Sequence, residues 1–270
     1  MTTIPIASKW GMPDSSPIEG HQFSYNEGVN AETRRRGNWW YCLITWLMRE
    51  VIYRATGGLR VQGLEHIPHD GPAIIVANHM SYLDPPALGV PPRRWVRAMA
   101  KEELFKGPLG WLLRSIGTHP VRRGSSDTDS IKWFIEQMKQ NSLVLMFPEG
   151  TRGDGETMGE LQPGVFMLSR RANAPIIPAG IRGTEIMWPR GSKKFRRHRI
   201  TIVYTAPIAP EDIPRDKVQA CRMLAERIAD ATELAGKRIG LPPSMQEASL
   251  PLAGEHDAPH DDALSGQKHH

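Results

Sequence analysis

The sequence predicts an α/β fold: a single domain with a mixed, largely parallel sheet flanked by helices. Short runs rich in Ile, Val and Leu, such as 73–77 and 143–147, are bounded by turn residues and have the length of buried strands. Segments with apolar residues at helical spacing, such as 125–140, alternate with these runs. The 270 residues also suffice for one sizeable core.

The N-terminal part is predicted to lie outside this domain. Residues 1–36 are polar and rich in Pro, Gly and Ser, which favours a flexible arm. Residues 37–58 contain three Trp in a short apolar run broken at Arg49-Glu50. No stretch reaches the roughly 18 apolar residues of a spanning helix, and the first thirty residues do not have the pattern of a signal peptide. We therefore expect an amphipathic helix in the membrane interface, or alternatively one packed on the domain.

The elements of the domain, 59–240, follow from the order of apolar runs and breakers. Strands are predicted at 59–64, 73–77, 95–100, 120–121, 143–147, 174–181 and 200–205. Helices are predicted at 87–90, 101–105, 109–116, 125–140, 164–171 and 215–239. Gly240 and the prolines after it end the last helix. Residues 241–270 are polar and acidic, and they are expected to be disordered.

The charge balance favours anionic partners. The net charge is +5, and the densest basic run is 190–199. This run can contact anionic lipid or the phosphates of a substrate, or it can be a solvated loop. Its aromatic content is limited to Phe195, so we expect no nucleic-acid partner. Two distant cysteines indicate no disulfide framework, and no ligand cluster at metal-binding spacing is evident, so no metal is expected.

The first chemical motif follows the predicted strand 73–77. His79 lies directly after this strand, where α/β folds place their chemistry. Asp84 follows in the same motif, and Pro85 disfavours helical geometry at Asp84. A turn that returns Asp84 to His79 would fix one ring nitrogen and leave the other as a base. The alternative is a surface histidine near an unrelated turn aspartate.

A second strand, 143–147, ends in the sequence Pro-Glu-Gly-Thr-Arg at 148–152. Two strands should thus deliver polar groups to one edge of the sheet. Asn-His-x4-Asp followed by Phe-Pro-Glu-Gly-Thr-Arg resembles the glycerolipid acyltransferase family, whose best-known members are the 1-acyl-sn-glycerol-3-phosphate acyltransferases. The resemblance covers roughly 59–210.

This resemblance implies transfer of a fatty acyl chain from acyl-CoA or acyl-carrier protein to the free hydroxyl of a lysophospholipid, most closely lysophosphatidate. It implies that His79 is the general base, that Asp84 orients it, and that no acyl-enzyme forms. The donor is a substrate, and no cofactor is implied. Substrate contacts are implied for Asn78, Arg122, Arg123, Glu149, Gly150, Thr151 and Arg152. The expected location is the cytoplasmic face of the cell membrane, as a peripheral or monotopic protein on the phospholipid surface.

One departure from the family pattern keeps the identity of the acceptor open. Family members often carry a lysine shortly before the glycine that corresponds to Gly164, but residues 161–163 read Leu-Gln-Pro. The acceptor could therefore be another lysolipid or a glycolipid. A non-catalytic lipid-binding membrane protein of the same fold is the alternative from another class.

Overall fold

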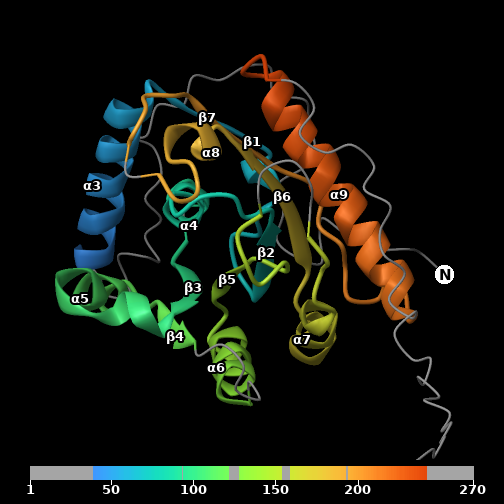
Figure 1. The fold of residues 1–270 in the computed structure, drawn as a ribbon. Coiled ribbons are helices and arrows are strands. Elements are labelled where there is room, and N and C mark those ends of the chain that lie inside the picture. The colour runs from blue at the N-terminus through green and yellow to red at the C-terminus, as the bar shows by residue number, and fades with distance from the viewer. Residues whose placement is uncertain (1–38, 93, 122–127, 154–158, 193, 242–270) are drawn as a thin grey trace, which may run out of the picture.

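The computed structural model describes residues 39–92, 94–121, 128–153, 159–192 and 194–241. Within them, seven strands form one sheet in the order β1-β7-β6-β2-β5-β3-β4 (Figure 1). The strands are β1 (Leu59–Gln62), β2 (Ala73–Ala77), β3 (Val96–Lys101), β4 (His119–Val121), β5 (Leu143–Met146), β6 (Ile176–Arg182) and β7 (Ile200–Tyr204). Only the β6–β7 pair is antiparallel among these strands. The predicted α/β fold with a mixed, largely parallel sheet is confirmed.

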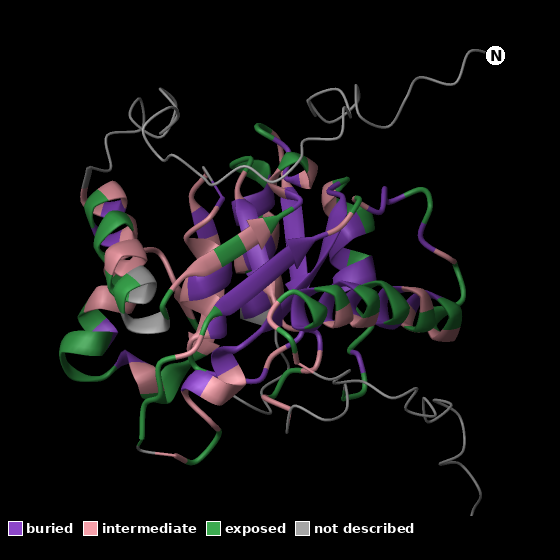
Figure 2. Cartoon of the chain, turned by 90° about the horizontal axis from the view of Figure 1, so that it is seen from above, coloured by how far each residue is buried: buried purple, intermediate pink, exposed green. Residues whose placement is uncertain are grey.

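Strand β2 lies at the centre of the sheet. It pairs in parallel with β5 on one side and with β6 on the other. All five of its residues are fully buried, which explains their continuous apolar sequence. Figure 2 shows this buried centre in purple. Because β2, β5 and β6 run in the same direction, the segments that follow them emerge at one edge of the sheet.

Helices cover both faces of the sheet. They are α3 (Trp39–Thr56), α4 (Asp84–Gly89), α5 (Gly107–Ser115), α6 (Thr128–Lys139), α7 (Gly164–Ala172), α8 (Thr184–Met187) and α9 (Lys217–Lys237), with 3-10 turns η2 (Leu64–His66) and η3 (Glu102–Phe105). Helices α6, α7 and α9 share one hydrophobic core with Ile74 and Val76 of β2. Helices α4 and α8 share the other core with Ile75.

The boundaries of two helices differ from the prediction for one physical reason. Helix α4 begins at Asp84, so the expectation that Pro85 would keep Asp84 out of helical structure was wrong. Helix α5 likewise begins at Gly107 and contains Pro108 in its first turn. A proline in the first turn removes an N–H that would have no partner within the helix, so it is compatible with a helix start. Helix α8 was not predicted.

Helix α3 occupies most of the predicted segment 37–58 and packs one face on the domain. The Tyr41 hydroxyl accepts a hydrogen bond from the Val96 N–H at 3.0 Å, and Ile44 is buried. The opposite face leaves Trp46 and Leu47 about half exposed. No helix in the described ranges combines the length and apolar character needed to cross a bilayer. The predicted arm, 1–36, and all but the first residue of the predicted tail, 241–270, lie outside the described residues.

Helix α9 approaches β6 closely at Gly180. A Cβ atom at this position would lie 2.2 Å from the backbone nitrogen of Thr232 in α9. Only glycine allows this approach, which brings α9 against the end of the sheet that carries the first motif.

Candidate active site

Asn78 directly follows β2 and fastens its end to the neighbouring elements. Its side-chain amide donates to the Ile181 carbonyl at 3.0 Å, and its Oδ1 accepts from the Ile181 N–H at 2.9 Å. The Thr232 hydroxyl of α9 lies 3.2 Å from the same Oδ1, and it also contacts the Ile228 carbonyl of its own helix at 2.7 Å. The side chain is only 1% exposed. These bonds give Asn78 a structural role, and its contact with substrate stays a prediction.

His79 and Asp84 lie within hydrogen-bonding distance, in the arrangement that the motif predicts. His79 Nδ1 lies 2.9 Å from Asp84 Oδ2. An ionised carboxylate only accepts hydrogen bonds, so Nδ1 carries the hydrogen and Nε2 of the neutral ring is the proton acceptor. The histidine side chain is 17% exposed, whereas that of Asp84 is fully buried.

The buried Asp84 carboxylate accepts hydrogen bonds at both of its oxygens. Its Oδ2 also accepts from the backbone N–H groups of Met80 at 2.6 Å and Ser81 at 2.7 Å. Its Oδ1 accepts from the Thr184 hydroxyl at 2.5 Å. Thr184 begins α8, which is distant in sequence, and no signal near the motif could have pointed to it. The first turn of α4 thus presents a carboxylate in one fixed orientation.

The second motif wraps around His79. The imidazole stacks on Phe147 with ring centroids 4.1 Å apart and an interplanar angle of 21°. The His79 N–H donates to Glu149 Oε1 at 3.1 Å, and its carbonyl accepts from the Gly153 N–H at 2.8 Å. The two predicted motifs therefore meet at one edge of the sheet, and His79 is fixed by both its side chain and its backbone.

Glu149 braces the two motifs through backbone groups. Besides the His79 N–H, its carboxylate accepts from the Gly159 N–H at 3.1 Å. Burial raises the pKa of Glu149, although these two hydrogen bonds act in the opposite direction. The described hydrogen bonds of Glu149 are to the backbone, and its contact with substrate stays a prediction.

The other predicted site residues differ in their surroundings, and two of them are not described by the structure. Gly150 has φ +64°, but its N–H donates to the Phe147 carbonyl at 3.1 Å, so it is already used in a turn. Thr151 is exposed, and its contact with substrate stays a prediction. The Arg152 guanidinium lies over the Tyr82 ring, 3.7 Å from the centroid. Arg122 and Arg123 lie outside the described residues.

The geometry of the His79–Asp84 pair suits a general base. Ser81 is fully buried, and its hydroxyl donates to the Trp188 carbonyl at 3.1 Å, so it is not presented for attack. His79 can take a proton at Nε2 and return it, while Asp84 stabilises the charged ring. Among the described residues, no group of three or more His, Cys, Asp or Glu could hold a metal ion.

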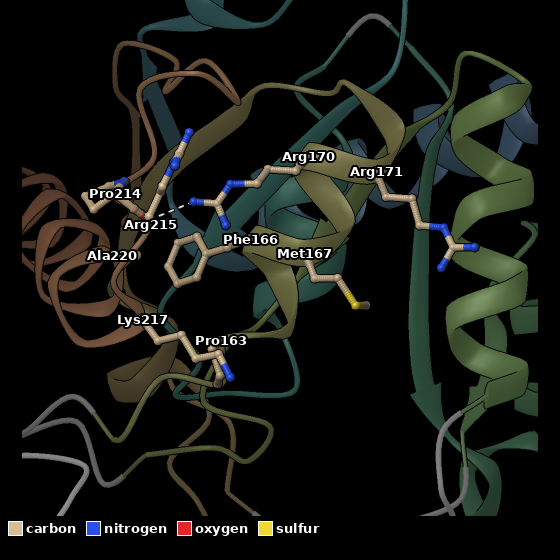
Figure 3. A pocket seen from close by; sticks show the side chains of 9 residues that line it. All are labelled: Pro163, Phe166, Met167, Arg170, Arg171, Pro214, Arg215, Lys217 and Ala220. Carbon is tan, nitrogen blue, oxygen red and sulfur yellow. Dashed lines mark hydrogen bonds between the residues drawn. The ribbon is translucent and has the colours of Figure 1, made fainter.

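A separate cavity of about 410 Å³ lies between α7 and the start of α9 (Figure 3). Phe166 contributes an apolar surface, and Arg215 and Lys217 contribute positive charge. The Arg170 guanidinium at this cavity donates to the carbonyl groups of Ile213 and Pro214 at 3.1 and 2.7 Å, which fastens the loop before α9. None of the predicted site residues lines this cavity.

Comparisons with known proteins agree with the motifs. A family model described as Acyltransferase matches residues 58–182. The 1-acyl-sn-glycerol-3-phosphate acyltransferase of Bacillus subtilis is 29% identical over 192 residues, which are 70% of this chain and 90% of that protein. The bovine enzyme of this name, form alpha, is 32% identical over 181 residues, covering 63% of this chain and 61% of its own length.

The chloroplastic Brassica napus enzyme BAT2 of the same name is 31% identical over 153 residues, which are 55% of this chain. The chain spans less than half of that relative, 44% of its length. The crystal structure of the 1-acyl-sn-glycerophosphate acyltransferase PlsC from Thermotoga maritima superposes with a TM-score of 0.64 at 24% identity. This match covers 76% of this chain and 82% of the other, and it shows a shared fold.

Proposed function

We propose that this chain, whose residues 58–182 match the Acyltransferase family model, transfers a fatty acyl chain from acyl-CoA or acyl-carrier protein to the free hydroxyl of lysophosphatidate, giving phosphatidate. The observation that carries the proposal is the His79–Asp84 pair, 2.9 Å apart and enclosed by the second motif. The names of the bacterial, plant and mammalian relatives support this acceptor.

The proposed reaction is direct. Nε2 of His79 takes the proton of the acceptor hydroxyl as its oxygen attacks the thioester carbonyl. The resulting imidazolium is stabilised by the Asp84 carboxylate. The C–S bond then breaks, the ester forms, and the imidazolium returns its proton to the departing thiolate. General-base catalysis of this kind contributes about 10²–10⁴-fold to the rate. The buried hydroxyl of Ser81 supports a mechanism without an acyl-enzyme.

Arg152 is the described residue that best suits the acceptor phosphate. A guanidinium can donate two parallel hydrogen bonds to phosphate oxygens. The loop that carries Arg152 is attached to the His79 backbone through Gly153, which keeps it beside the proposed base. Arg122 and Arg123 are proposed as further phosphate contacts on the strength of their motif alone.

We further propose that the protein docks on the cytoplasmic face of the cell membrane through α3 and α5. Trp40 joins the two helices: its indole donates to the Ser115 hydroxyl at 3.0 Å, and its ring meets Trp111 edge-on at 5.4 Å. Trp111 is 60% exposed beside the open face of α3, which carries Trp46 and Leu47. Exposed Trp and Leu side chains on adjoining helices are typical of insertion at the lipid headgroup level.

Flotation with vesicles that contain anionic lipid tests this docking. The double variant Trp46→Asp, Leu47→Asp should lose most of its bound fraction. Leu234→Asp is the matched control, because Leu234 is an exposed apolar residue on α9. Equal binding of both variants would contradict docking through α3.

The activity itself is tested with purified protein, labelled acyl-CoA or acyl-carrier protein, and a panel of acceptors. The panel contains lysophosphatidate, lysolipids with larger headgroups and monoacylglycerol. Labelled phosphatidate and thiol release that depends on lysophosphatidate are expected. Transfer to a different acceptor would overturn the lysophosphatidate assignment. Absence of any acceptor-dependent thiol release would overturn the proposal that the protein catalyses acyl transfer, and it would favour a non-catalytic lipid-binding protein.

A further inference from the structure

Tyr82, which was not among the predicted site residues, contacts one of them. It lies within the first motif, three residues after His79, and its side chain is 49% exposed. The guanidinium carbon of Arg152 lies 3.7 Å from the centroid of the Tyr82 ring. This is a close cation–π contact between the two motifs, at the edge of the His79 site.

The backbone of Arg152 is fixed independently of this contact. The N–H of the next residue, Gly153, donates to the His79 carbonyl at 2.8 Å. The carbonyl of Arg152 itself accepts from Nη1 of Arg190 at 2.9 Å. The Cα of Arg152 is therefore held beside His79, and only the long, flexible side chain needs further ordering.

The Tyr82 ring supplies this ordering while the guanidinium edge stays usable. Among the described residues, no carboxylate forms an ion pair with Arg152. A guanidinium that stacks on a ring presents its N–H groups around the edge, in the plane where a phosphate is bound. Within the part of the chain that the structure describes, the cation is thus supported by an aromatic ring and not by an acidic side chain that would compete with a ligand.

The turn at 188–192 supports both ends of this arrangement. The carbonyl of Trp188 accepts from the Ser81 hydroxyl, and its ring packs against Tyr82 with centroids 5.7 Å apart. The Trp188 indole closes the turn by donating to the Ser192 carbonyl at 2.8 Å. The same turn carries Arg190. It lies beyond residue 182, where the match to the acyltransferase family model ends.

We propose that Tyr82 and Arg190 are positioning residues that hold Arg152 as the arm for a phosphate monoester on the acceptor. This inference rests on the proposed function and extends it, because it makes acceptor recognition depend on a turn outside the family-matched segment. Arg152 contacts the phosphate, whereas Tyr82 fixes its side chain and Arg190 fixes its backbone.

Steady-state kinetics of the full chain test this inference through two Michaelis constants. Tyr82→Leu should raise the KM for lysophosphatidate by about 2- to 5-fold, the size of a half-exposed cation–π contact. In this variant, the KM for the acyl donor and kcat should both stay within about 2-fold of their wild-type values. Tyr82→Phe keeps the ring and should restore the wild-type KM. A purely structural defect would not separate the two substrates or distinguish Leu from Phe.

Arg190→Met gives a second test of the inference, which is independent of the Tyr82 variants. It should raise the KM for lysophosphatidate beyond that of Arg196→Met, which removes the same charge from an exposed neighbour whose described bond is made by its backbone N–H. An unchanged acceptor KM in both Tyr82→Leu and Arg190→Met would overturn the inference, as would equal effects on acceptor and donor. If the wild-type protein does not acylate lysophosphatidate at all, the proposed function fails and the inference fails with it.

Discussion

Replacing the Asp84 carboxylate by an amide should separate its chemical role from its structural one. In the wild-type protein, the N–H donors of His79, Met80 and Ser81 share Oδ2 of Asp84. In Asp84→Asn, the remaining side-chain oxygen can face the same three donors. The new NH₂ group then faces the Thr184 hydroxyl, which can rotate to accept. The hydrogen-bonding pattern therefore survives, but the negative charge does not.

The expected magnitudes follow from this pattern. A hydrogen bond to a charged group contributes about 1.5–3 kcal/mol and a neutral one about 0.5–1.5 kcal/mol. Weakening three such bonds is partly offset because no charge is buried, so we expect the free energy of unfolding to fall by about 1–4 kcal/mol. The imidazolium loses its counter-charge, and kcat should fall by about 10²–10⁴-fold.

The assay is acyl transfer to lysophosphatidate at saturating substrate, together with urea unfolding of the same preparation. Thr184→Val is the matched variant, because it removes the donor to Oδ1 but leaves the charge. It should lower kcat by less than about 10-fold. The orienting role of Asp84 would be refuted by a folded Asp84→Asn protein whose kcat stays within about 10-fold of wild type. This limit lies well inside the expected loss of about 10²–10⁴-fold.

Three further predictions concern the frame of the site. Asn78→Ala leaves the buried N–H and carbonyl of Ile181 without their partner, so the free energy of unfolding in urea should fall by about 2–5 kcal/mol. Burial raises the pKa of Glu149 above 4.5, so the folded state binds this proton more tightly than the unfolded state. The free energy of unfolding should therefore fall as the pH rises from about 4.5 through the folded pKa, and Glu149→Gln should lack this contribution. Gly180→Ala forces a methyl group to 2.2 Å from the backbone of α9 and should cost about 1–3 kcal/mol, seen as a lower Tm.

The sheet was predictable because its central strands are buried on both faces. Such strands read as continuous apolar runs, and the predicted bounds of β2, 73–77, coincide with the observed strand. The two motifs follow β2 and β5, which are parallel neighbours. Because parallel neighbours end at the same edge of a sheet, His79 and the 148–152 segment could be predicted to lie close together. The helix starts at Asp84 and Gly107 differ from the prediction because a proline in the first turn of a helix does not interrupt it.

The contacts that hold the site were less predictable because they join distant segments. Thr184 lies on a four-residue helix, too short for any apolar period, and it reaches Asp84 across 100 residues. Arg152 meets Tyr82 only because the two motifs fold together. Asn78 reads as part of a chemical motif, yet its described bonds are to β6 and α9.

Whether His79 is the base for acyl transfer is decided by the rate at which His79→Ala acylates lysophosphatidate. His79→Ala should lower kcat by about 10²–10⁴-fold in a protein that still folds, because the backbone bonds to Glu149 and Gly153 remain. Its free energy of unfolding should fall by about 1–3 kcal/mol, because the hydrogen bond to Asp84 is lost. His69→Ala, at an exposed histidine outside the site, should keep the wild-type rate. A folded His79→Ala protein with the wild-type rate would contradict the account.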